Sequence, residues 1–110
     1  MSENVGQGHA DEDGEEWIKI EDPFARRLIE TYLSRRNEDI AIMRTALGVG
    51  ELDLVRVKGH NLIGSGSAYG LNKISELGRL IEAAVRLEDK KEISIQISNL
   101  EKYIRSVRIL

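Results

Sequence analysis

The chain has no cysteine, a single proline and no long apolar run. The missing cysteine excludes disulfide bonds, zinc sites built from thiolates and thiol catalysis. No apolar stretch approaches the roughly 20 residues that a membrane-spanning helix needs. The first residues are acidic, whereas a signal peptide begins with a basic segment followed by an apolar one. We therefore expect a cytoplasmic protein without a membrane partner.

Histidine is also scarce, because only His9 and His60 are present. One histidine in the part that we expect to fold, without any cysteine, makes no credible transition-metal site. The glycine-rich segment 64–70 lacks the lysine and the preceding strand of a phosphate-binding loop. We expect neither a resident metal or cofactor nor an independent hydrolase, kinase or oxidoreductase activity.

Charge divides the chain into two parts. Residues 1–16 carry six acidic and no basic side chains, whereas the other 94 residues carry 16 basic and 13 acidic ones. The first part also has few large apolar groups, which predicts a disordered acidic tail over 1–16 and a single domain over 17–110. A domain with a net charge of only +3 suits an acidic protein surface and is too weakly basic to indicate nucleic-acid binding.

Apolar spacing predicts four helices. The first follows the N-cap Asp22 and ends at Gly48–Gly50, and the second covers about 52–69. The third begins at an N-cap, Asn72, and the fourth runs from the charged turn 88–91 through Val107. The expected inward stripes are Phe24, Leu28, Ile29, Tyr32, Leu33, Ile40, Met43 and Leu47, then Ile74, Leu77, Ile81, Ala84 and Val85, then Ile93, Ile97, Leu100, Ile104 and Val107. Arg36 shares the spacing of the first stripe but is expected to extend along the surface.

These helices and their short links predict an all-α fold, an antiparallel four-helix bundle. The apolar residues Trp17, Ile18 and Ile20 precede the first helix, and we expect them to strap onto the bundle.

The second helix carries His60 on a polar side. At 100° per residue, Arg56, Gly64 and Ser67 fall within about one quadrant of His60, and Asp53 lies two turns before it. The buried stripe, formed by Val55, Gly59, Leu62, Gly66 and Tyr69, falls on other sides of the helix. His60 is therefore expected to point towards water or a partner.

Glycine is unusually frequent here, at positions 59, 64, 66 and 70. Each one inside a helix costs about 1 kcal/mol relative to alanine. Gly59 and Gly66 are expected to let another helix approach closely, Gly64 to clear space beside His60, and Gly70 to end the helix.

The residues His60-Asn61-Leu62-Ile63-Gly64, followed by Ser67 and Gly70, resemble the signature of histidine-containing phosphotransfer (HPt) domains. The helical plan of residues 22–110 is also similar to that family. Ile63 departs from the pattern, because the family usually has a lysine there that helps to hold the phosphoryl charge.

The resemblance implies a phosphocarrier of a two-component phosphorelay. His60 would accept a phosphoryl group from an aspartate of a receiver domain, with a hybrid histidine kinase as a further partner. The receiver would supply Mg²⁺ and the catalytic carboxylates, so the carrier would be a cytoplasmic phosphoprotein and a monomer without turnover of its own.

The accessory residues have more than one reading. Arg56 and Lys73 are candidate phosphate neighbours that would compensate for Ile63, although helical basic residues are commonly only solvated. Ser67 either binds a phosphate oxygen or is simply small enough to admit the partner, and we favour the second. Gly64 is expected to act as a steric gap.

Three alternatives remain. His60 could be an ordinary surface histidine. The chain could be a helical docking module that binds a receiver or a kinase without being phosphorylated, which Ile63 favours. It could also be a homodimeric bundle whose interface uses the Trp17 patch or the last helix.

Overall fold

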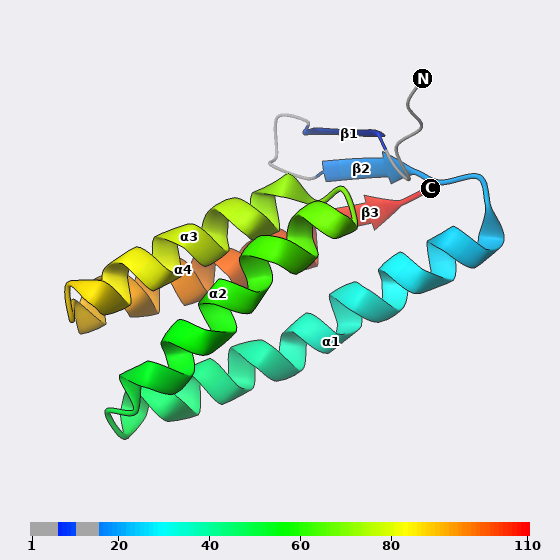
Figure 1. Ribbon diagram of the computed structural model, residues 1–110. Coiled ribbons are helices and arrows are strands. Elements are labelled where there is room, and N and C mark those ends of the chain that lie inside the picture. Colours follow the sequence, from blue (N-terminus) through cyan, green and yellow to red (C-terminus); the bar gives the residue numbers. More distant parts are fainter. Residues whose placement is uncertain (1–6, 11–15) are drawn as a thin grey trace.

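The computed structural model describes residues 7–10 and 16–110, which form four helices and a small sheet (Figure 1). The helices are α1 (Pro23–Gly48), α2 (Leu52–Ala68), α3 (Asn72–Arg86) and α4 (Lys90–Ser106). The strands are β1 (Gln7–Ala10), β2 (Glu16–Lys19) and β3 (Val107–Ile109). None of the described helices is long and apolar enough to cross a membrane.

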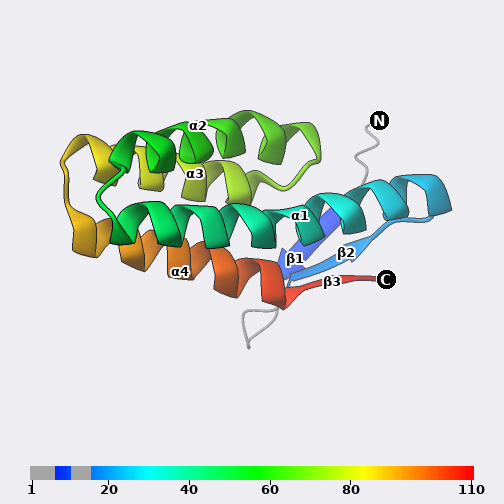
Figure 2. The ribbon, with the colours of Figure 1, turned by 90° about the horizontal axis from the view of Figure 1, so that it is seen from below.

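The four helices run up and down in sequence order and pack as an antiparallel bundle, as predicted. Helices α2 and α3 form one layer, and α1 and α4 form the other (Figure 2). One apolar core joins the layers, and its fully buried members include Met43, Val55, Ile81 and Ile97. The local spacing of apolar residues therefore identified most of the core.

The helix ends follow from a few local signals. The Asp22 carboxylate accepts a hydrogen bond from the Phe24 amide at 3.0 Å, and Pro23 occupies the first helical position. Gly50 and Gly70 adopt positive φ angles of 80° and 75°, which end α1 and α2 with short turns. The predicted N-cap Asn72 is wrong, since Leu71 is the cap residue and Asn72 already lies inside α3. Leu71 is buried, and its amide donates a hydrogen bond to the Gly66 carbonyl at 2.8 Å. The turn between α2 and α3 therefore ends at Leu71, one residue before the predicted cap.

The sheet is the part that helical spacing did not predict. Strand β2 pairs with β3 in parallel, with Ile18 opposite Ile109, and with β1 in antiparallel fashion. Val107 was expected to continue the last helix, but its backbone pairs with β2. Ile18 and Ile20 belong to the core, which confirms the predicted strap for these two residues, whereas Trp17 is only partly buried.

The predicted disordered tail needs a correction at two places. Gln7–Ala10 and Glu16 belong to strands, because β3 occupies only one edge of β2 and the other edge pairs with β1. Residues 1–6 and 11–15 of the predicted tail lie outside the described residues.

The start of α1 extends beyond α2, which changes two predicted burials (Figure 1). Phe24 and Leu28 were expected to face inward, but their exposed fractions are 69% and 44%. Tyr32, one turn after Leu28, is the first residue of that row to be buried, because α2 begins to cover α1 there.

Candidate functional site

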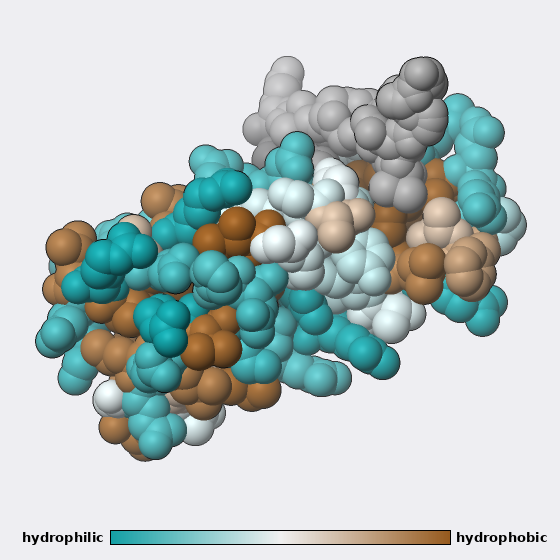
Figure 3. All heavy atoms as spheres, viewed as in Figure 1, coloured by the Kyte–Doolittle hydropathy of each residue, from teal (hydrophilic) through white to brown (hydrophobic). Residues whose placement is uncertain are grey.

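His60 lies in the middle of α2 and faces away from the core. Its side chain is 67% exposed, whereas Val55, Gly59, Leu62 and Gly66 of the same helix are buried. The two sides of the helix therefore differ as the spacing predicted. A space-filling view from the side of α2 shows hydrophobic and hydrophilic residues interspersed, with a pale area of intermediate hydropathy over its C-terminal half (Figure 3).

The carboxylate of Glu82 on α3 contacts one nitrogen of this imidazole. His60 Nδ1 lies 3.3 Å from Glu82 Oε2 and 3.4 Å from Oε1, and the Glu82 side chain is only 18% exposed. A carboxylate can only accept a hydrogen bond, so the neutral ring donates from Nδ1–H and leaves its lone pair on Nε2. Nε2 has no hydrogen-bond partner among the described residues. The contact thus orients the ring and leaves the lone pair of Nε2 directed outward.

Sequence reasoning missed Glu82. It lies 22 residues after His60 on another helix, and an acidic residue on an exposed helix face is usually only solvated. The contact depends on how α2 and α3 are aligned, which a single sequence does not reveal.

That alignment comes from three glycines at the α2–α3 contact. A Cβ atom on Gly59 would lie 3.0 Å from Ile81 Cγ2, and one on Gly66 would lie 2.7 Å from the Ser75 amide nitrogen. A Cβ on Gly78 of α3 would lie 2.6 Å from the Gly59 carbonyl oxygen. The predicted role of Gly59 and Gly66 is confirmed, and Gly78 is the residue opposite them that the sequence reading missed.

Gly64 differs from these glycines. It lies one turn after His60 on the exposed side, and a Cβ built on it would meet no atom within 4 Å. Its φ angle is not positive. Neither packing nor backbone geometry within the described residues therefore requires a glycine at this position.

Arg56 lies one turn before His60, as predicted. Its Nη2 and Nε atoms lie 2.9 and 3.0 Å from Asp53 Oδ1, so this guanidinium is tied to the first turn of α2. Ile63, on the α3 side of His60, is partly buried and carries no charge.

Two further arginines lie on α3. Arg79 precedes Glu82 by three residues and Arg86 follows it by four, so both lie on the side of α3 that carries Glu82. Both are exposed, and neither forms an ion pair among the described residues. The face around His60 therefore carries arginines from both helices, although sequence reasoning had named only Arg56.

Ser67 lies two turns after His60, and its hydroxyl is directed towards α3. Its Oγ lies 3.1 Å from Ser75 Oγ, and Ser75 in turn donates to the Ile63 carbonyl at 2.6 Å. This contact makes Ser67 part of the α2–α3 packing. Because its side chain is small, it protrudes little from the exposed face of α2.

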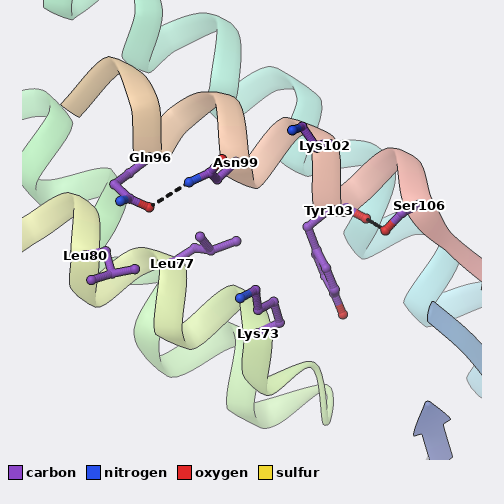
Figure 4. Close-up of a pocket in the computed structure, with 8 residues that line it drawn as sticks. All are labelled: Lys73, Leu77, Leu80, Gln96, Asn99, Lys102, Tyr103 and Ser106. Carbon is purple, nitrogen blue, oxygen red and sulfur yellow. Dashed lines mark hydrogen bonds between the residues drawn. The ribbon is translucent and has the colours of Figure 1, made fainter. Parts of the chain in front are cut away.

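The structure does not bring Lys73 to His60. Lys73 lies nine residues before Glu82, which is half a turn from it around α3 and about 13 Å along the axis. Its side chain lies instead at a groove between α3 and α4, together with Leu77, Lys102 and Tyr103, and its Nζ is 3.7 Å from Glu76 (Figure 4).

The residues that come together are therefore His60, Glu82, Gly64 and Arg56, with Arg79 and Arg86 on the neighbouring helix. This arrangement supports nucleophilic attack by Nε2 on an electrophile presented from outside. Within 7–10 and 16–110, no three histidine or acidic residues gather to hold a metal ion. Comparisons of this chain with protein-family models, with curated proteins and with solved structures give no match.

Proposed function

We propose that this protein is a histidine phosphotransfer carrier. The lone pair of His60 Nε2 attacks the phosphorus of an aspartyl phosphate on a receiver domain, and the P–O bond to the aspartate breaks. The receiver carboxylate leaves, and the imidazole carries the phosphoryl group until a second aspartate takes it in the reverse reaction.

The observation that carries this proposal is the contact between His60 and Glu82. Attack through Nε2 places positive charge on the ring, and the Glu82 carboxylate beside Nδ1–H stabilises that charge. The exposed position on a rigid helix leaves the outer nitrogen open to in-line approach. An ordinary surface histidine does not need a partly buried carboxylate to orient it.

Gly64 gives independent support. A glycine inside a helix costs about 1 kcal/mol relative to alanine, and nothing in the part of the chain that the structure describes requires one at this position. A steric gap one turn from the nucleophile would let a receiver domain approach closely.

In this proposal, two arginines of α3 balance the negative charge of the phosphoryl group. HPt domains usually carry a lysine where this chain has Ile63. Arg79 and Arg86 are free of ion pairs within the described part of the chain, and they lie one turn on either side of Glu82. Long arginine side chains can reach across the α2–α3 surface and bind phosphate oxygens in bidentate fashion.

In this proposal the carrier has no turnover of its own. The receiver partner supplies the Mg²⁺ and the carboxylates that activate the aspartyl phosphate, as the resemblance to HPt domains implies. The carrier acts in the cytoplasm as a monomer, between a hybrid histidine kinase or its receiver and a second receiver.

The test is transfer of labelled phosphate from a panel of phosphorylated receiver domains to three proteins. Wild type and Ser94→Ala, an exposed position on α4, should both gain a label that is labile in acid and stable in alkali. His60→Gln should gain none while its circular dichroism and thermal unfolding remain unchanged. Equal labelling of His60→Gln would overturn the proposal.

Ile63 favours one alternative, a docking module that binds a receiver or a kinase without being phosphorylated. Binding by His60→Ala that equals wild-type binding, together with no phosphohistidine from any receiver, would identify this function. Loss of transfer in His60→Gln with retained binding identifies the carrier.

A further inference from the structure

A second concave surface lies between the first half of α1 and the end of α2. Its cavity volume is about 540 Å³, within the range of about 300–1,000 Å³ that small-ligand sites occupy. Ser65 of α2 and the C-cap residue Tyr69 line it, and they lie about 140° and 180° around that helix from His60. This groove is therefore separate from the face proposed for phosphotransfer.

Two adjacent rows of α1 form one side of the groove. Arg27 and Arg35 belong to a row with a spacing of four residues, and Leu28, Tyr32 and Arg36 form the neighbouring row with the same spacing. Arg27 and Arg35 are about 12 Å apart along the helix axis. The rows place positive charge along the length of the groove.

Tyrosines make the floor rigid. The rings of Tyr32 and Tyr69 stack with their centroids 4.3 Å apart and their planes at 23°. The Tyr32 hydroxyl lies 2.7 Å from Ser65 Oγ, which ties α1 to α2 at this point. A ligand would therefore meet a surface that is already formed.

Arg36 is held in place at the same floor. Its guanidinium carbon lies 4.2 Å from the centroid of the Tyr32 ring, and its Nε lies 3.2 Å from Asp39 Oδ2. Asp39 does not line the groove and lies 3.4 Å from Lys58 as well. Arg36 is the least exposed of the three arginines, and ordering it costs little on binding.

Part of the positive charge of the groove is not neutralised by the described residues, since only Arg36 of its three arginines pairs with a carboxylate, that of Asp39. Its lining contains three arginines and no carboxylate. Arg27 and Arg35 are exposed and form no ion pair in the part of the chain that the structure describes. Guanidinium groups match phosphate oxygens in a planar, bidentate geometry.

We propose that this groove binds a small ligand of the nucleotide type, which carries at least two phosphate charges and a flat, largely apolar body. Arg27, Arg35 and Arg36 bind the phosphates, and the body lies against Leu28 and Tyr69. The concave shape and the rigid aromatic floor favour a small molecule over an acidic segment of another protein.

The test uses the full chain and four probes, namely ADP, pyrophosphate, adenosine and a glutamate-rich peptide. Binding is followed by ¹⁵N–¹H NMR titration at about 150 mM salt, where weak surface attraction is largely screened. The variant Arg27→Gln/Arg35→Gln removes two charges from the groove. The matched control, Lys90→Gln/Lys91→Gln, removes two charges from the start of α4 at exposed positions.

We expect ADP to bind saturably, to shift the signals of Tyr32, Ser65 and Tyr69, and to bind more tightly than pyrophosphate or adenosine. Binding should weaken about tenfold or more in Arg27→Gln/Arg35→Gln and remain at the wild-type level in the lysine control. The proposal is overturned if no phosphate probe binds saturably, if adenosine binds as tightly as ADP, or if both double variants lose affinity equally. Saturable binding of the peptide without ADP would assign the groove to an acidic protein.

Discussion

At the scale of single residues, glycine serves two purposes within one helix. Gly64 contacts nothing where a side chain would begin, whereas Gly66, half a turn further on, meets the backbone of Ser75. The first glycine lowers the stability of α2 without any packing gain among the described residues, and the second makes close helix packing possible. Substitutions at the two positions should therefore act in opposite directions.

Gly64→Ala should raise the free energy of unfolding by about 0.5–1 kcal/mol, because alanine has the higher helix propensity and its Cβ meets open space. Gly66→Ala should lower it by about 1–3 kcal/mol, since the new Cβ would overlap the Ser75 backbone. Urea unfolding of the two variants and of wild type measures both effects.

Gly64→Leu extends this comparison to function. Its fold should be as stable as wild type, while phosphotransfer from a receiver should fall strongly because the leucine fills the gap beside His60. Transfer at the wild-type rate in Gly64→Leu would contradict the proposed docking role.

Glu82 provides a further prediction at this scale. Glu82→Gln keeps the size of the side chain and removes the charge that favours Nδ1–H on His60. The population of this tautomer, measured by ¹⁵N NMR of the imidazole, should decrease, and the rate of phosphotransfer should fall about tenfold. A changed transfer rate with an unchanged tautomer population would show that Glu82 acts in another way.

At the scale of elements, α2 and α3 form the most closely packed helix pair of the bundle. Gly59 and Gly78 lie opposite each other at the α2–α3 contact, one residue before His60 and four residues before Glu82 respectively. The position of the carboxylate beside the imidazole therefore depends on the absence of side chains at this contact.

Gly78→Ala should separate the two helices. Its Cβ would lie 2.6 Å from the Gly59 carbonyl oxygen and 2.9 Å from Leu62 Cβ, so we expect a loss of about 1–3 kcal/mol in unfolding free energy. Gly48→Ala is the control, because a Cβ there meets nothing within 4 Å. Calorimetry or urea unfolding compares the two, and equal stabilities would mean that the helix pair adjusts to the added atom.

At the scale of the whole molecule, an ion pair links the first helix of the chain to the last. Arg44 of α1 lies 2.9 Å from Glu101 of α4, and Arg105 lies 3.0 Å from the other oxygen of the same carboxylate. The hydrogen bond from Arg44, with the charges of Arg44 and Arg105, lowers the pKa of Glu101 below its ordinary value. These contacts tie the longest helix to the last one.

The lowered pKa makes part of the stability dependent on pH. A carboxylate whose pKa is lower in the folded state stabilises the fold above its unfolded pKa, and this contribution disappears as the pH falls through the folded pKa. Glu101→Gln should therefore be slightly less stable than wild type at pH 7, and the difference should shrink on acidification and vanish once the carboxyl group is protonated in the folded state too. Urea midpoints between pH 7 and pH 2.5 measure it, and a difference that grows on acidification would contradict this assignment.

How much of the fold could be predicted depends on how local its causes are. The stripe of Ile74, Leu77 and Ile81 and the outward direction of His60 follow from a period of 3.6 residues, which is present in each segment by itself. The pairing of β2 with β3 joins residues about 90 positions apart, and no local pattern marks it. The apolar spacing around Val107 continues that of α4, but its backbone pairs with Glu16 of β2. The strand pairing, and not the spacing, therefore determines its conformation.

The candidate site divides in the same way. The sequence by itself determined four amphipathic helices, the exposed histidine and the unusual glycines of α2, because these depend on residue type and spacing within one helix. Only the tertiary structure decided that Glu82 meets His60, that Lys73 lies on the other side of α3, and that three arginines line a groove with Tyr32 and Tyr69. The physical reason is that these relations depend on the rotation and alignment of one helix against another, which packing across the core sets.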